Sequence, residues 1–226
     1  MSTLRIDNLE EYTNANGINV NDTLKVDTIS EKTTASGVTI DGVLIKDGQV
    51  DGKDVSTLSA SPIGLVSSST GVSGVSEVVF DNVFTSSYLF YKLVFTYEPS
   101  GTADFRMVFR NGGASGSDIA ANYDSKYTYL TTSQTAYQMG TSGAGQTYIT
   151  LMNGSAADSD YGLNMEIYNP FVSTKKTTGF MQGTWKDGGQ LQTSFSHDSE
   201  ESCTGFRLYV ATGTMAGDFL LYGYGV

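Results

Sequence analysis

The chain has 226 residues and a formal net charge of −11, a length that allows one large domain or one medium domain with an appendage. Its 13 lysines and arginines are dispersed along an acidic chain, which argues against a surface that follows phosphates, so no nucleic-acid partner is expected. The 26 glycines, 14 tyrosines and 11 phenylalanines favour short strands and tight turns, and we predict an all-β fold.

Residues 1–11 are too charged to form the apolar core of a signal peptide. No uninterrupted apolar run reaches transmembrane length, so membrane insertion is not expected. The single cysteine, Cys203, excludes an intrachain disulfide framework and is expected to be a small, partly buried hydrophobe. Stability is therefore expected to come from packing and assembly, in a chain compatible with a reducing cytoplasm.

Residues 1–55 contain a repeat with a period of 20 residues, in which Leu4 to Asp7 align with Leu24 to Asp27. The apolar positions of the repeat keep the same register, and those expected to serve oligomerisation or anchoring are Ile18, Val20, Leu24, Val38, Ile40 and Leu44. Alternation with polar residues predicts strands. A fixed period of this size is typical of stacked units that cannot bury their apolar faces alone.

Each predicted strand of the repeat offers only two or three apolar side chains on one side. Burial of each stabilises by about 1.5–3 kcal/mol, which does not offset the entropy lost on ordering twenty backbone positions. We therefore predict a short β stalk or anchoring arm that needs other copies, three around a common axis being preferred. The alternative is a disordered acidic leader.

Residues 56–76 hold eight serines, two threonines and three glycines, and they are predicted to be a linker or an extended segment. Ile63, Leu65 and Val66 indicate that part of this segment packs.

Residues 77–226 alternate large apolar and polar residues in short runs, as in Leu89 to Tyr97 and in Phe105 to Phe109. We expect about ten strands, separated by turns at Asn111-Gly112-Gly113, Asn153-Gly154 and Asp187-Gly188-Gly189. One apolar face per strand predicts a two-sheet β-sandwich of jelly-roll type.

Two sets of residues resemble virion proteins of tailed bacteriophages, notably fibre and decoration proteins of cyanophages and other aquatic phages. The first set runs from Val26 to Thr33 and from Gly37 to Gly48. The second comprises Phe80 to Phe84, Asn169-Pro170-Phe171 and Leu221 to Gly225. The resemblance covers about half of the chain, and it implies a trimeric virion component, assembled in the host cytoplasm, with no chemistry of its own.

The only histidine, His197, lies in an acidic stretch next to Ser196 and Asp198, and a solvated loop explains it better than a catalytic triad. Asp47, Asp51 and Asp54, or Asp158 and Asp160, lack the spacing of a calcium loop, so no metal or cofactor is predicted. Tyrosines among Ser, Gly and Asn suit adaptable, sugar-stacking surfaces, and the candidate receptor-facing loop aromatics are Tyr123, Tyr127, Tyr137 and Tyr161. Cross-strand packing is their alternative role.

The leading functional hypothesis is a trimeric, non-enzymatic tail fibre or appendage on the virion surface. Its N-terminus would anchor it to other virion proteins, and its sandwich would bind a glycan or protein of the host surface. A head decoration protein that stabilises the capsid is the first alternative. A carbohydrate-active fibre tip is a minor one, because glycan cleavage needs two carboxylates held at a defined separation.

Overall fold

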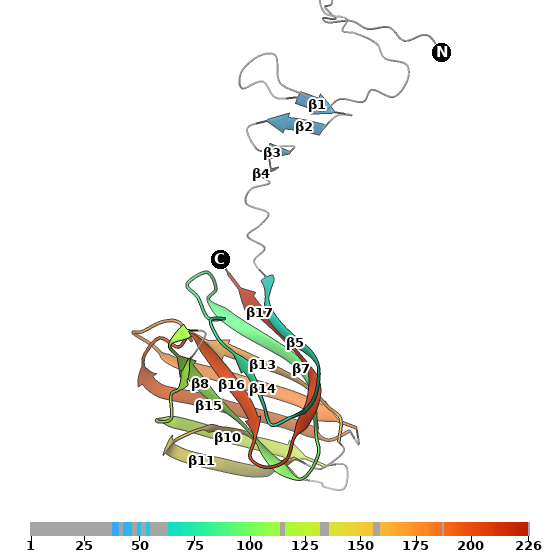
Figure 1. The fold of residues 1–226 in the computed structure, drawn as a ribbon, viewed down its shortest axis with the longest axis vertical. Helices are drawn as coiled ribbons and strands as arrows, with labels where there is room; N and C mark the ends of the chain where they lie inside the picture. The colour runs from blue at the N-terminus through green and yellow to red at the C-terminus, as the bar shows by residue number, and fades with distance from the viewer. Residues whose placement is uncertain are drawn as a thin grey trace, which may run out of the picture. The chain divides into compact units, whose positions relative to one another are not determined.

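The computed structural model describes residues 63–113, 116–131, 136–155, 159–186 and 188–225, together with the backbone of four short strands between residues 38 and 54. The chain divides into two compact units, Met1–Ser59 and Ala60–Val226, which are described separately. All regular structure in the described residues is β-strand (Figure 1).

The first unit contains a small antiparallel sheet of the strands β1 (Val38–Ile40), β2 (Val43–Lys46), β3 (Gln49–Val50) and β4 (Lys53–Asp54). Val38 and Ile40 of the predicted anchoring set lie on β1, and Leu44 lies on β2 opposite Thr39. Ile18, Val20 and Leu24 lie outside the described residues. The predicted stalk and its 20-residue repeat therefore stay predictions.

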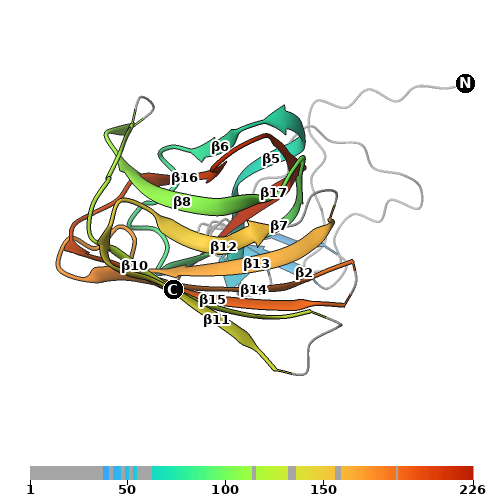
Figure 2. The same cartoon turned by 90° about the horizontal axis from the view of Figure 1, so that it is seen from below.

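The second unit is built from two antiparallel sheets, which Figure 2 shows as two layers. The large sheet has the order β11 (Gln138–Gln146), β10 (Tyr123–Leu130), β15 (Gln190–Glu200), β14 (Lys176–Trp185), β13 (Tyr161–Tyr168), β7 (Phe90–Pro99), β17 (Met215–Tyr224), β5 (Ile63–Val75). The small sheet has the order β12 (Ile149–Ser155), β8 (Ala103–Asn111), β16 (Gly205–Val210), β6 (Glu77–Phe80), and β9 (Ser117–Asp118) pairs with β8. The predicted all-β character of this part is confirmed.

The core lies between the two sheets, where the alternating apolar residues of both meet. On β7, Tyr91, Leu93, Phe95 and Tyr97 are buried, as their spacing predicted. The rings of Tyr97 on β7 and Phe105 on β8 stack with centroids 4.3 Å apart, which joins the two sheets directly. The two layers are thus held by aromatic packing, the main source of buried apolar area in such a core.

Of the Ser-rich segment expected to be a linker or an extended segment, residues 63–75 form β5, the edge strand of the large sheet, so this part is not a linker but is extended and packed. β5 pairs with β17 over its whole length, from Ile63 opposite Tyr224 to Val75 opposite Met215. Val66, Val72 and Val75 pack against the core. Composition left a linker and an extended segment open because serine and glycine are uncommon in strands, yet small residues are tolerated where one side of the strand faces solvent.

Two further local predictions differ from the structure. Asn153-Gly154 does not form a turn but lies inside β12, where the pairing with β8 is irregular between Met152 and Ser155 and Gly154 has φ of +61°. The strand β11 was not predicted, since its glycines hide any alternation. One of these, Gly140, lies under the ring of Tyr127, and a Cβ there would be 2.0 Å from Tyr127 Cζ.

Candidate functional site

The sandwich has two ends that the strand register defines. At one end, Ile63 of β5 lies opposite Tyr224 of β17, Tyr224 lies opposite Phe90 of β7, and Phe90 lies opposite Tyr168 of β13. This is the junction end, because the chain passes from residue 60 into Ile63 there. Seven residues further along β7, Tyr97 lies opposite Tyr161, about 23 Å away at about 3.3 Å per residue. We call that side the distal end.

A pocket of about 140 Å³ opens at the distal end between the two sheets, lined by Tyr129, Met152, Asn153, Gly154, Ser155, Tyr161, Trp185 and Leu191. The pairing of strands explains this gathering. Trp185 ends β14 directly opposite Tyr161, the first residue of β13, and Tyr129 lies opposite Leu191 on the neighbouring strands. Their rings are close, with the centroids of Tyr161 and Trp185 5.8 Å apart.

Gly189 allows Trp185 to lie flat at the end of its hairpin. A Cβ on Gly189 would stand 2.0 Å from two atoms of the indole ring, so any larger residue would displace it. The backbone N–H of Trp185 donates to the carbonyl of Gly189 (3.3 Å), and that of Gly188 donates to the carbonyl of Trp185 (2.9 Å). The turn between β14 and β15 therefore fixes the indole in the pocket wall.

The opposite wall comes from β12 and is held by hydrogen bonds. Asn153 Nδ2 donates to Tyr127 Oη (2.8 Å), and the Gly154 N–H donates to Asp104 Oδ1 (3.1 Å). Deeper in, Ser155 Oγ donates to the carbonyl of Ala103 (2.6 Å) and lies 3.0 Å from Tyr97 Oη. Aromatic faces thus stand beside a backbone and amide rim that is fixed before any ligand arrives.

A second hollow of about 350 Å³ adjoins the pocket on the other side of Tyr161, and it is lined by Thr96, Tyr97, Glu98, Asp160, Tyr161, Gly162 and Gly217. Tyr161, which is only 5% exposed, thus lines both the aromatic pocket and a hollow with two carboxylates. Flat apolar faces next to hydrogen-bonding groups suit a ligand with both kinds of surface, such as a sugar ring.

The four tyrosines predicted to be receptor-facing loop aromatics lie in three settings. Tyr161, 5% exposed on β13, lines the pocket, and Tyr127 on β10 holds Asn153 at its rim, so neither lies in a loop as predicted. Tyr137 is 54% exposed and donates to Gln190 Oε1 (3.3 Å). Tyr123 does not fit the prediction, because it is fully buried on β10 and therefore cannot contact a receptor.

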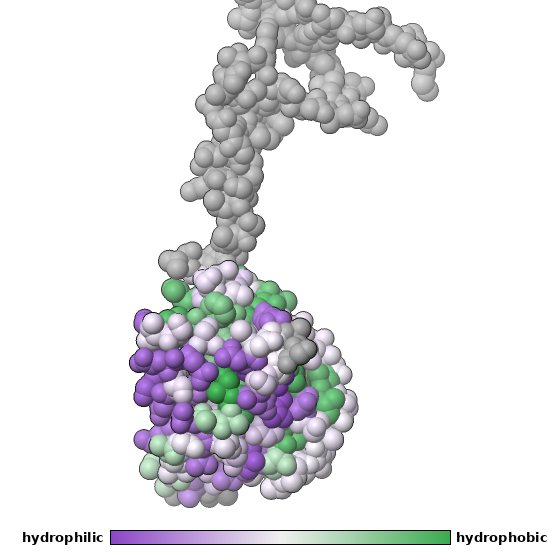
Figure 3. All heavy atoms as spheres, turned by 60° about the vertical axis from the view of Figure 1, so that its left-hand side comes forward, coloured by the Kyte–Doolittle hydropathy of each residue, from purple (hydrophilic) through white to green (hydrophobic). Residues whose placement is uncertain are grey.

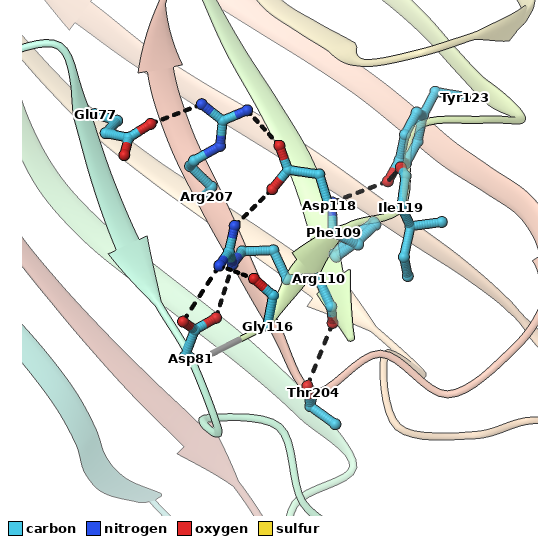
Figure 4. Close-up of polar contacts among 10 residues, drawn as sticks. All are labelled: Glu77, Asp81, Phe109, Arg110, Gly116, Asp118, Ile119, Tyr123, Thr204 and Arg207. Atoms are coloured by element: carbon cyan, nitrogen blue, oxygen red, sulfur yellow. Dashed lines mark hydrogen bonds and ion pairs between the residues drawn. The ribbon is translucent and has the colours of Figure 1, made fainter. Parts of the chain in front are cut away.

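Tyr123 serves the core instead, as Figure 4 shows. Its hydroxyl accepts from the Phe109 N–H (2.9 Å) and donates to the carbonyl of Ile119 (2.6 Å), so it satisfies two backbone groups between the sheets. A buried hydroxyl needs such partners, and burial raises the pKa of Tyr123.

A charged network occupies the outer face of the small sheet (Figure 4). Arg110 binds Asp81 (Nε to Oδ1, 2.8 Å) and Asp118 (Nη1 to Oδ1, 2.6 Å), while Arg207 binds Asp118 and Glu77 (Nη1 to Oε2, 2.7 Å). Arg110 also donates to the carbonyl of Gly116. Each charge has a partner within the network, so the network ties β6, β8, β9 and β16 together and is structural.

The residues considered for nucleophilic chemistry are buried. His197 lies on β15 with no exposed surface, not in a solvated loop as expected, and its Nε2 is 3.5 Å from Glu201 Oε1. Cys203 is also fully buried, and burial raises the pKa of its thiol to about 12. A substrate in solvent cannot reach either side chain.

Sequence reasoning missed Trp185, Tyr129 and Asn153 as members of one pocket. Trp185 carried a usable signal, since the only tryptophan of the chain lies two residues before a predicted turn. Tyr129 carried the same signal as the other tyrosines but was not among the four selected. Asn153 carried none, because it joins the pocket through pairings between strands far apart in the sequence.

Comparison with known proteins gives no family for this chain: no protein-family model matches it, and no curated protein matches it. The described residues include no helix with the length and hydrophobicity to cross a bilayer. In the same part of the chain, no group of three or more His, Cys, Asp and Glu side chains is placed to hold a metal ion.

Proposed function

We propose that the chain is a structural component of a tailed-bacteriophage particle, in which the C-terminal sandwich attaches the particle to a glycan of the host surface. The proposal combines the resemblance of residues 26–48 and of the C-terminal patches to phage fibre proteins with the aromatic pocket at the distal end. In it, the N-terminal repeat forms a trimeric stalk anchored to other virion proteins, and the sandwich has jelly-roll topology.

The observation that carries the proposal is the position of the pocket. Tyr129, Tyr161 and Trp185 meet at the end of the sandwich opposite the strand end where the chain comes in from residue 60. The strand end at Ile63, where the chain enters the sandwich, is thus not the end that carries the pocket, and an attachment domain needs its binding site clear of its chain connection. Aromatic rings with few rotatable bonds suit such a site because little side-chain entropy is lost on binding.

The proposed role is non-enzymatic. The only histidine and the only cysteine are buried in the sandwich, and the pocket presents aromatic and amide groups to a ligand. Such groups bind and orient a sugar without changing it.

The test is binding of the full chain to a glycan array and to phage-susceptible aquatic bacteria. We expect W185A and Y129A each to reduce binding at least tenfold, because each removes an aromatic face from the pocket. F171A is the matched control, since Phe171 is a partly exposed aromatic residue just after β13 at the junction end. Equal binding by wild type and W185A, or equal loss in F171A, would contradict the proposed site.

A further inference from the structure

We propose that the outer face of the large sheet at the junction end is where the sandwich of one chain contacts the sandwich of a second copy. This apolar face comprises Ile63, Leu65, Phe90, Val94, Tyr222 and Tyr224. The inference rests on the proposed self-association of the N-terminal unit and extends it to the sandwich.

The six residues share one face because of the register of three neighbouring strands. Tyr224 of β17 lies opposite Ile63 of β5 and opposite Phe90 of β7. Residues directly opposite each other on paired strands project to the same side of a sheet. The rings of Phe90 and Tyr224 stack with centroids 4.5 Å apart, and Tyr168 of β13 extends the row.

The second row repeats this arrangement two residues along. Tyr222 lies opposite Leu65 on one side and opposite Lys92 on the other. Val94 follows Lys92 at the next outward position of β7 and continues the apolar surface toward the middle of the sheet. The three strands therefore carry an apolar surface that is interrupted on β7 by Lys92.

This surface is exposed to an unusual degree for a sheet face that should be polar. Leu65 is 56% exposed, Ile63 49% and Val94 40%. Figure 3 draws another side of the C-terminal unit, on which hydrophobic residues gather toward the upper end and hydrophilic residues cover much of the left-hand part. An antiparallel sheet with one solvated face normally places polar residues there, and a contiguous apolar exception marks an interaction surface.

The charges of this face favour an identical face of a second copy as its partner over a protein with a strongly charged surface. Within the face, Lys92 and Glu166 pair with each other (Nζ to Oε1, 3.7 Å) and their charges cancel. Asp218 lies at its border, beside Val94, and is the one carboxylate there that this pair does not neutralise. A partner with a basic or acidic surface would find little complementary charge here.

Chain connectivity places a second copy at this face. Ala60 begins the sandwich unit, and Ile63 is both the first residue of β5 and a member of the apolar face. If the 59 residues before it associate between copies, the residues that follow directly emerge close together. Each β5 strand then brings its half-exposed apolar side, with Leu65 56% exposed, close to that of its neighbour, at the high effective concentration that a short connection provides.

The first experiment measures the assembly state of the full chain by sedimentation velocity over a concentration series. We expect wild type to be oligomeric at low micromolar concentration and the double variant L65R/V94R to need at least a tenfold higher concentration for the same oligomer fraction. M139R is the matched control, because Met139 is 81% exposed on β11 at the other edge of the same sheet. A monomeric wild type, or an equal shift in M139R, would overturn the proposal.

A second measurement tests the same face without introducing arginines into it. Native Cys203 is fully buried, so L65C places one accessible thiol on the apolar face. We expect labelling of this thiol to slow at least tenfold as the protein concentration rises into the oligomeric range, whereas M139C is labelled at one rate throughout. Equal labelling of L65C at all concentrations excludes burial by a neighbour. An oligomer with an accessible L65C shows that only the N-terminal unit associates, which leaves the proposed stalk intact and this inference wrong.

Discussion

The buried histidine makes the stability of this sandwich depend on pH. His197 has no exposed surface, and its ring lies 4.8 Å from that of Tyr123 and 6.0 Å from that of Phe109, centroid to centroid. Burial lowers the pKa of His197 below its usual 6.5, because the imidazolium ion loses its hydration there. The carboxylates of Glu201 and Asp198 act in the opposite direction and do not reverse the shift.

We therefore expect the sandwich to lose stability as the pH falls below about 6.5. In that range the unfolded chain binds a proton at this imidazole and the folded chain does not, so the free energy of unfolding falls by at most about 1.4 kcal/mol per pH unit. Above that range both states are neutral at this group and the contribution is constant. Thermal unfolding of wild type and H197F between about pH 7.5 and pH 5.5 measures it.

All other titratable groups are the same in wild type and H197F, so the difference between their melting temperatures at each pH reports the titration of His197. The melting temperature of wild type should fall relative to that of H197F as the pH decreases. A constant difference between the two proteins across this range would mean that His197 is protonated equally in the folded and unfolded chain.

At the scale of single strands, the alternation of apolar and polar residues predicted those with one buried and one solvated face. The strands β7 and β13 are examples, in which Tyr91 to Tyr97 and Leu163 to Ile167 follow the expected pattern. The strand β11 was not predicted, and residues 63–75 were expected only as a linker or an extended segment, because serine and glycine give no alternating signal. The strand β5 pairs with β17, and its Gly71 N–H donates to Asp218, which lies 147 residues further along the chain, a partner that local composition cannot report.

The candidate site shows the same limit. The reasoning that tyrosines among small polar residues suit binding surfaces selected both Tyr161 and Tyr123, but Tyr161 lines the pocket whereas Tyr123 lies inside the core. The two differ in what their hydroxyl groups and rings meet across the sandwich, since Tyr123 binds the backbone of Phe109 and Ile119. That difference is fixed by tertiary packing and has no counterpart in the neighbouring sequence.

One side chain closes the edge of the large sheet. Tyr88 lies across the glycine pair formed by Gly223 of β17 and Gly64 of β5, where a Cβ would stand 2.5 Å from Tyr88 Cγ and 3.0 Å from Tyr88 Oη, respectively. Its ring also contacts Tyr91 of the core, with centroids 5.7 Å apart. An aromatic ring over paired glycines supplies the packing that the missing side chains cannot.

We expect Y88A to loosen β5 without unfolding the sandwich. Amide hydrogen exchange in residues 63–75 should become about tenfold faster, equivalent to about 1.4 kcal/mol of local opening free energy. Exchange in β13 and β14, in the middle of the sheet, should not change. Y88F keeps the ring and should exchange like wild type. Uniformly faster exchange in all strands would instead show that Tyr88 supports the whole core.

At the scale of the whole molecule, the sandwich has one function proposed for each end. The apolar face lies near Ile63 at the junction end, and the aromatic pocket lies at the distal end, about 23 Å along β7. Copies that associate through the junction end are related by symmetry, so their pockets are held together on one assembly. Weak binding by each pocket then becomes strong attachment to a surface that carries many copies of the ligand.

This arrangement predicts that loss of self-association lowers attachment without changing the pocket. On a densely coated glycan surface, L65R/V94R should bind at least about a hundredfold more weakly than wild type, the lower range of avidity gains. On a sparsely coated surface, where only one pocket engages at a time, the two proteins should bind equally. Surface binding at graded ligand density measures both, with M139R as the control that keeps wild-type behaviour. If L65R/V94R matched wild type on the dense surface, each copy would be acting alone, and the link between the two ends would be lost even with an intact pocket.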